Sequence, residues 1–153
     1  MTKRVNLYAH VNLLQPFVDY SQAAAAESGL EPILKELVKI RASQINGCAM
    51  CLMLHTTEAR RIGESEMRIY LLDGWREAQH FTPRERAAIA WTEALTKLDH
   101  AAMDEAYAMI EAEFNEQERV WLSMLIGIIN VYNRLNIGFQ VSPPRSAQIA
   151  VAA

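Results

Sequence analysis

Two cysteines and a histidine stand close together near the middle of the chain, as Cys48, Cys51 and His55. On a helix, in which each residue turns by about 100°, these three side chains share one face. Gly47 is expected to end the preceding helix, so Cys48 would lie in a first turn, where unpaired N–H groups and the helix dipole favour a thiolate. Two thiols at this spacing can close a disulfide, one attacking and the other resolving. The segment therefore predicts thiol redox chemistry.

Glu36 is the fourth candidate residue. In the helix predicted before the cysteines it shares a side with Ile40 and Ser43, whereas Lys39 lies towards the other side. A carboxylate on an apolar face is costly without a partner, and the next helix offers His55 or a thiol. A carboxylate that orients an imidazole, which in turn takes a thiol proton, is the usual way to activate such a nucleophile. We therefore predict that Glu36 and His55 tune the cysteine pair.

Residues that start and stop helices divide the chain into segments of helical length. Pro32 suits the first turn of a helix, and the segments 82–85 and 115–118 have the pattern of capping boxes. No segment alternates at period two for long enough to require a strand. We therefore predict an all-α, single-domain helical bundle with helices over residues 16–27, 32–46, 48–62, 65–72, 83–97, 104–114 and 116–136.

The helical domain is expected to span residues 1–141, followed by an extended or mobile tail over residues 142–153, which contains a Pro-Pro pair. Residues 120–132 are apolar nearly all the way round their predicted helix, and such a helix must be enclosed. In a chain of 153 residues, association with further copies of the same chain is the economical way to enclose it. The sequence therefore predicts a homo-oligomer.

The bulk composition excludes several classes of function. The net charge of -3 argues against a nucleic-acid-binding protein, which needs a concentrated basic face. The longest apolar stretch is too short and too interrupted for a membrane span of about 20 residues, and the N-terminus lacks a signal-peptide pattern. We therefore expect a cytoplasmic protein, in which two cysteines are more often reactive or metal-binding than structural. No motif for nucleotides, flavin or haem is present, so no bound cofactor is predicted.

The spacing of Glu36, Cys48, Cys51 and His55 resembles the core pattern of the alkylhydroperoxidase D-like family, within the carboxymuconolactone decarboxylase superfamily. Similar surroundings extend the resemblance over residues 30–137. It implies an all-helical fold that assembles as a trimer or hexamer and reduces a hydroperoxide with electrons from a dithiol reductant. It also implies that Cys51 is the peroxidatic thiol, Cys48 the resolving thiol, and Glu36 with His55 the proton relay.

Two features of the sequence stand against parts of this expectation. The helix-dipole argument alone favours Cys48 as the stronger nucleophile, whereas the resemblance favours Cys51, because a base four residues further on can act on it directly. The best-known family members also carry a histidine just before the second cysteine, where this chain has Met50. A proton carrier is therefore missing, which would lower peroxidase activity or indicate another substrate. Decarboxylation is not expected, because the decarboxylase branch lacks the cysteine pair.

The same residues allow three other functions. A disulfide reductase or redox adaptor would use the cysteine pair without significant peroxide turnover. Cys48, Cys51, His55 and Glu36 could instead hold zinc, which sulfur and nitrogen ligands suit. A non-catalytic helical oligomer that scaffolds partners would show thiols of ordinary reactivity at neutral pH.

Overall fold

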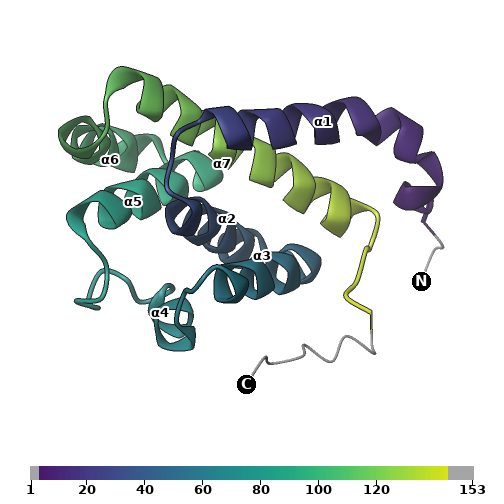
Figure 1. The fold of residues 1–153 in the computed structure, drawn as a ribbon, viewed down its shortest axis with the longest axis horizontal. Coiled ribbons are helices and arrows are strands. Elements are labelled where there is room, and N and C mark those ends of the chain that lie inside the picture. The colour runs from purple at the N-terminus through teal and green to yellow at the C-terminus, as the bar shows by residue number, and fades with distance from the viewer. Residues whose placement is uncertain (1–3, 145–153) are drawn as a thin grey trace.

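The computed structural model describes residues 4–144 and shows an all-α protein, as the sequence predicts (Figure 1). Within that range the chain forms no strand. The elements are a 3₁₀ helix and seven α-helices: η1 (Leu7–His10), α1 (Val11–Glu27), α2 (Pro32–Asn46), α3 (Ala49–Arg61), α4 (Glu66–Leu71), α5 (Pro83–Lys97), α6 (His100–Glu113) and α7 (Glu116–Gly138). Most of the predicted tail, over residues 142–153, lies outside the described residues.

Local sequence sets most of the helix boundaries. The predicted capping box at α5 is present, because the Glu85 N–H donates to the Thr82 hydroxyl (3.2 Å) and the Thr82 N–H donates to the Glu85 carboxylate (2.8 Å). Asn115 and Glu118 form the second predicted box, at the start of α7. Ser65 caps the short α4. These helices therefore begin where short-range hydrogen bonds favour a start.

Two helices begin earlier than the sequence analysis predicts. The helix predicted to start at Pro16 starts five residues before it, because η1, capped by Asn6, leads directly into α1, and a proline here removes only one backbone hydrogen bond. α6 starts at His100, four residues early, because the Asp99 carboxylate accepts hydrogen bonds from two N–H groups of the first turn.

The core is built around α2, which packs against α3, α5 and α7 (Figure 1). α6 packs on α5, and α1 lies along α7. Leu37, Ile40, Ile89, Ile126 and Ile129, from the three central helices, are almost completely buried. Burial of a side chain of this size stabilises the fold by about 1.5–3 kcal/mol. α2, α5 and α7 therefore form the central core, and α3, which carries Cys51, packs against it.

Helix α7 is only partly enclosed by the rest of the chain. Leu122 and Ile126 are buried, but Val120 and Val131 are 60% and 40% exposed. The prediction that this helix is enclosed therefore holds for one of its faces, and cover of the other face by a second subunit stays a prediction. No helix within residues 4–144 combines the length and the hydropathy that a membrane crossing requires.

Candidate active site

The junction between α2 and α3 positions the two cysteines. α2 ends at Gly47, whose backbone is left-handed (φ 71°, ψ 32°), a conformation that glycine adopts without steric cost. The Cys48 N–H donates back to the Ser43 carbonyl (3.0 Å), and α3 starts at once, at Ala49. Cys48 is therefore the cap residue of α3 and lies just outside the helix. The predicted start of this helix at Cys48 was wrong by one residue.

The two cysteines are in contact. The backbone N–H of Cys51 donates to the Sγ atom of Cys48 (3.4 Å), and through this hydrogen bond Cys48 caps α3. Both residues are free thiols and both are buried, with 1% and 2% of their surface exposed, against Ala42 and Ile129. Thiols this close can form a disulfide with little movement of the backbone.

The surroundings of the two thiols differ. Burial raises the pKa of the Cys48 thiol to about 11, and its hydrogen bond with the Cys51 side chain acts in the same direction. The Cys51 N–H and the Asn133 side chain oppose this shift of the Cys48 pKa without offsetting it. The helix-dipole argument for Cys48 as the stronger nucleophile therefore meets an opposing effect, because burial raises the pKa of this thiol, and the choice of the attacking thiol stays a prediction. Cys51 Sγ instead accepts a hydrogen bond from Nδ2 of Asn136 (3.3 Å).

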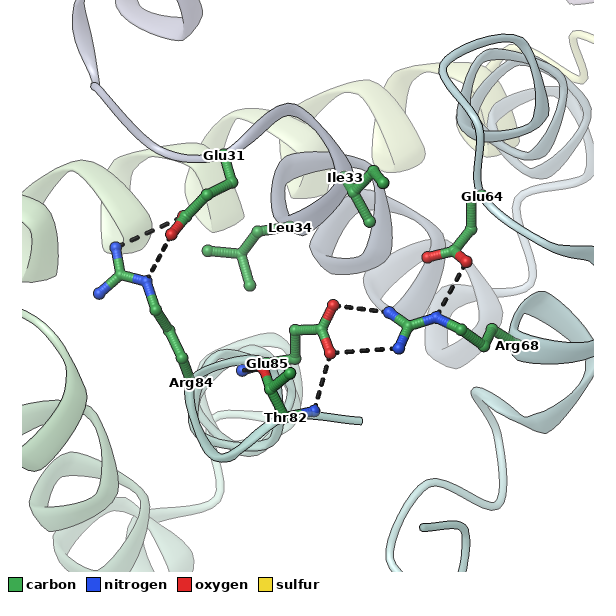
Figure 2. A pocket seen from close by; sticks show the side chains of 8 residues that line it. All are labelled: Glu31, Ile33, Leu34, Glu64, Arg68, Thr82, Arg84 and Glu85. Atoms are coloured by element: carbon green, nitrogen blue, oxygen red, sulfur yellow. Dashed lines mark hydrogen bonds and ion pairs between the residues drawn. The ribbon is translucent and has the colours of Figure 1, made fainter. Parts of the chain in front are cut away.

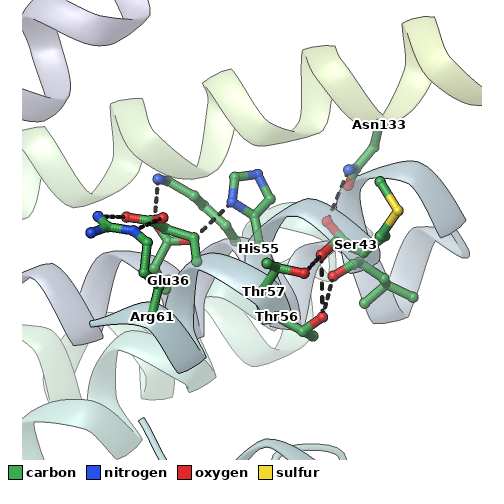
Figure 3. Close-up of polar contacts among 11 residues, drawn as sticks. Glu36, Ser43, His55, Thr56, Thr57, Arg61 and Asn133 are labelled. Carbon is green, nitrogen blue, oxygen red and sulfur yellow. Dashed lines mark hydrogen bonds and ion pairs between the residues drawn. The ribbon is translucent and has the colours of Figure 1, made fainter. Parts of the chain in front are cut away.

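Glu36 from α2 and His55 from α3 meet one helical turn beyond Cys51 (Figure 3). Nδ1 of His55 lies 2.8 Å from Oε2 of Glu36, and Figure 3 shows the second ring nitrogen pointing away from the carboxylate. An ionised carboxylate only accepts hydrogen bonds, so Nδ1 carries the proton. In the neutral ring this leaves Nε2 with a free lone pair, which can act as a base.

Lys39 also reaches Glu36, with Nζ 2.7 Å from Oε1. The placement of Lys39 towards the other side of the helix was wrong, because its long side chain bends back across one turn. Burial by itself would raise the pKa of Glu36, but the hydrogen bond from His55 and the charge of Lys39 together lower this pKa below its usual value. Glu36 therefore stays ionised at neutral pH and can stabilise a positive charge on His55.

The four predicted site residues form two adjacent pairs rather than one cluster. Within residues 4–144 no hydrogen bond joins His55 to either sulfur, although Glu36 is bound to His55 and Cys48 to Cys51. In the same part of the chain, no group of three or more His, Cys, Asp or Glu side chains is arranged as a metal site. The zinc alternative therefore lacks a formed ligand set, and a bridging molecule would let His55 exchange a proton with Cys51.

A pocket of about 250 Å³ lies beside His55, between α1 and α7. Its walls are mostly apolar, and its polar groups include Lys39 and Tyr132, whose hydroxyl lies 2.9 Å from Oγ of Ser21. Ile129 and Tyr132 line this pocket and also pack against the cysteines. A small molecule in the pocket would therefore lie close to both residue pairs.

The asparagines of α7, for which the sequence predicts no role, connect this helix to the site. Nδ2 of Asn46 donates to Oδ1 of Asn130 (2.9 Å) and to Oδ1 of Asn133 (2.8 Å). Asn133, fully buried, donates to Oγ of Ser43 (3.0 Å), as Figure 3 shows. The signal was present in the sequence: three asparagines, the last being Asn136, recur every three residues in an apolar helix, and buried amides need partners.

The chain belongs to the carboxymuconolactone decarboxylase family, which it matches over residues 12–94. Among its relatives, the uncharacterized protein YdfG of Bacillus subtilis (strain 168) is 35% identical over 138 residues, which are 90% of this chain and 94% of YdfG. The uncharacterized protein YnjA of Escherichia coli (strain K12) is 29% identical over 115 residues, 74% of this chain and 63% of YnjA.

Two solved structures have the same fold. One is ATU0492 of Agrobacterium tumefaciens, a protein of unknown function with the suggested role of an antioxidant defence protein, AhpD. It is 38% identical to this chain, with a TM-score of 0.82 over 94% of this chain and 99% of ATU0492. The other is an uncharacterized peroxidase-related protein of Silicibacter sp. TM1040, 21% identical, with a TM-score of 0.73 over 89% of this chain and 72% of that protein. The match to ATU0492 supports the AhpD-like form of the family, and the match to the second structure shows the shared fold.

Proposed function

We propose that this protein is a thiol-dependent peroxidase, which reduces hydroperoxides through a dithiol–disulfide cycle of Cys51 and Cys48 with Glu36 and His55 as the proton relay. The contact between the two cysteines carries the proposal, since it places a resolving thiol beside an attacking one. The Glu36–His55 pair one turn away supplies a base with a fixed tautomer. The suggested antioxidant role of ATU0492 supports the same class of activity.

The cycle has three steps. The Cys51 thiolate attacks the O–O bond of the hydroperoxide, an S–O bond forms, and the alkoxide leaves and takes up a proton, so that an alcohol and a Cys51 sulfenic acid result. The Cys48 sulfur then attacks the Cys51 sulfur, an S–S bond forms, and the hydroxyl group leaves as water with the Cys48 proton. An external dithiol reduces the disulfide by exchange and supplies two electrons.

The relay moves one proton in the first step. His55 takes the Cys51 proton through Nε2, with water or the hydroperoxide as the bridge, and returns it to the leaving alkoxide. Glu36 holds Nδ1–H of His55 and stabilises the positive ring while it carries two protons. The lowered pKa of Glu36 suits this role, because its carboxylate stays charged throughout the cycle.

Burial of the thiols favours a small hydroperoxide over a protein disulfide as the oxidant. Both cysteines are almost fully buried, whereas the pocket beside His55 has room for a small molecule. A disulfide reductase or redox adaptor would have to expose a sulfur to a protein disulfide in its oxidising step, whereas the proposed peroxidase meets a dithiol only in its reducing step. This observation ranks peroxide reduction above the adaptor function.

The test is the reaction of the reduced protein with tert-butyl hydroperoxide. We expect two thiols to be lost for each hydroperoxide reduced, with a Cys48–Cys51 disulfide detected by mass spectrometry. The Cys48→Ser variant should stop at a sulfenic acid on Cys51, trapped by dimedone, and Cys51→Ser should not react. Faster disulfide formation with an oxidised dithiol than with the hydroperoxide would identify a reductase, and ordinary alkylation rates with no peroxide reaction would identify a scaffold.

The proposal includes the partners and the place of action. The reducing cytoplasm would return the pair to the dithiol state between cycles, through a dithiol reductant. A trimer or hexamer would cover the apolar side chains that α7 leaves exposed, such as Val120 and Val131. Light scattering should then give a mass of three or six chains. The mass of a single chain would contradict this part of the proposal.

A further inference from the structure

Asn136, in the last turns of α7, is placed against the sulfur of Cys51. It is 7% exposed, and its Nδ2 donates a hydrogen bond to Cys51 Sγ over 3.3 Å. Within residues 4–144 its side chain makes no other hydrogen bond. A donor aimed at a sulfur favours the thiolate over the thiol, because the anion is the stronger acceptor.

The position of Asn136 is fixed by contacts on both sides. Three residues earlier, Asn133 is held by Asn46 and Ser43 from the end of α2, next to Cys48. After the helix, the Val141 N–H donates to the Asn136 carbonyl (2.8 Å). Other hydrogen bonds therefore fix the position of α7, and with it the position of the Asn136 amide beside Cys51. A donor that is held in place in this way can stabilise a negative charge that develops on the sulfur.

The two cysteines differ in the donors that face them. Cys48 Sγ accepts from the Cys51 backbone N–H, and burial raises the pKa of the Cys48 thiol to about 11, because it outweighs this N–H and the Asn133 side chain, which lower that pKa. Cys51 Sγ accepts from a side-chain amide that comes from a different helix. We propose that Asn136 selects Cys51, rather than Cys48, as the thiolate of the pair by donating its side-chain amide to the Cys51 sulfur.

The consequence for the cycle rests on the proposed peroxidase function, whereas the ionisation of Cys51 does not. An amide donates a hydrogen bond but transfers no proton at neutral pH. Asn136 therefore stabilises the Cys51 thiolate, and the proton still leaves through His55. In the cycle this gives attack by Cys51 and resolution by Cys48, which is the assignment that the geometry of the thiols alone leaves open.

The test measures thiolate formation at Cys51 in the Cys48→Ser background, from the ultraviolet absorbance of the thiolate as the pH is raised. Serine keeps an oxygen that can cap α3. Asn136→Leu, which has the same branched shape and no donor, should raise the pH midpoint of Cys51 thiolate formation by about one to two pH units. Asn136→Asp has the same shape and adds a negative charge, so the midpoint of Cys51 in this variant should rise at least as far. This variant provides the test if the leucine variant does not fold.

The control is Thr92→Val, which removes a fully buried hydroxyl of α5 that donates to the Ala88 carbonyl (2.7 Å) and not to a sulfur or to the asparagines of α7. It should lower the melting temperature as Asn136→Leu does and leave the midpoint of Cys51 unchanged. An unchanged midpoint in Asn136→Leu and Asn136→Asp would overturn the inference.

The titration needs no peroxide, so it separates the two proposals. A shifted midpoint in a protein that does not react with tert-butyl hydroperoxide would leave the role of Asn136 standing and remove the peroxidase. Rapid peroxide reduction together with an unshifted midpoint in both Asn136 variants would leave the peroxidase standing and remove the role of Asn136.

Discussion

Two regions of this protein bring glutamates and cations together, and they differ in whether a group that can carry a proton keeps an unpaired nitrogen. The relay region consists of Glu36, Lys39 and His55. The second region is a pocket of about 370 Å³ between α2, α4 and α5, which we call the ion-pair pocket (Figure 2). It is lined by Glu31, Ile33, Leu34, Glu64, Arg68, Thr82, Arg84 and Glu85.

In the ion-pair pocket the charges bind one another. Arg68 donates to Glu64 (2.9 Å) and to Glu85 (2.6 Å), and Arg84 donates to Glu31 (2.8 Å). Within residues 4–144 a single buried side-chain oxygen, Oε2 of Glu64, has no hydrogen-bond partner. Neither a thiol nor an imidazole lines this pocket. Arginine does not give up its proton in proteins, so these pairs hold helices together without moving protons.

The relay region contains an imidazole, which can both accept and donate a proton. One nitrogen of His55 is fixed by Glu36, and the other remains available beside a pocket and within a turn of Cys51. A cluster of charges is therefore a poor sign of function by itself. A proton-carrying group with a free lone pair, next to a nucleophile, is the better sign.

The largest expected effect belongs to the relay region. His55→Gln removes the base, so the rate of hydroperoxide-dependent oxidation of Cys51 should fall by about 100-fold or more, as measured by stopped-flow mixing. The free energy of unfolding should change little, because Gln keeps an N–H donor for Glu36, which also retains its ion pair with Lys39. His100→Gln, at an exposed histidine at the start of α6, is the control and should keep the wild-type rate. A similar rate for His55→Gln and wild type would remove the relay from the mechanism.

The next effect belongs to the ion-pair pocket. Arg68→Met leaves the Glu64 carboxylate buried without its cation, which should lower the free energy of unfolding by about 3 kcal/mol in urea denaturation. The initial rate of peroxide-dependent thiol oxidation should stay the same. Arg61→Met breaks the exposed pair with Glu58 and should leave stability unchanged. A slower thiol reaction in folded Arg68→Met would mean that the two regions are coupled.

A smaller effect is expected from pH at Glu36. Its pKa is lowered in the folded protein, so the unfolded chain binds more protons around the usual carboxyl range and stability rises with pH there. The stability that the Glu36 carboxylate contributes is present above a pH of about 4.3 and is lost as the pH falls through the folded pKa. The stability difference between wild type and Glu36→Gln should shrink over that range in urea titrations. A pH-independent difference would show that the charge of Glu36 is not stabilised.

The smallest expected effect concerns the backbone that joins the relay region to the thiols. Gly47→Ala forces a residue with a Cβ into a left-handed conformation, so the free energy of unfolding should fall by about 1 kcal/mol. Gly127→Ala is the matched control, since Gly127 is helical with open space for a Cβ, and it should stabilise by about 0.5–1 kcal/mol. Equal effects of the two substitutions would mean that the left-handed backbone at Gly47 does not determine the cost of adding a side chain there.

Short-range signals predicted most of the fold. Prolines, glycines and capping residues placed α2, α4, α5 and α7 within a few residues, because these signals act within one turn of chain. The same locality explains the errors at α1 and α6, where Asn6 and Asp99 supplied starts that were overlooked. The sequence also predicted that Glu36 meets the next helix, with His55 or a thiol as its partner, and the structure shows that the partner is His55.

The sequence by itself determined that the protein is all-helical, that Cys48 and Cys51 are neighbours, and that Glu36 can reach His55, because each of these depends on residues at most 19 apart. Only the tertiary structure decided that Cys48 is desolvated, that Lys39 joins Glu36, and that Asn136, 85 residues from Cys51, donates to its sulfur. The physical reason is that burial and long-range hydrogen bonds depend on how α7 packs against α2 and α3, and no local spacing specifies that packing.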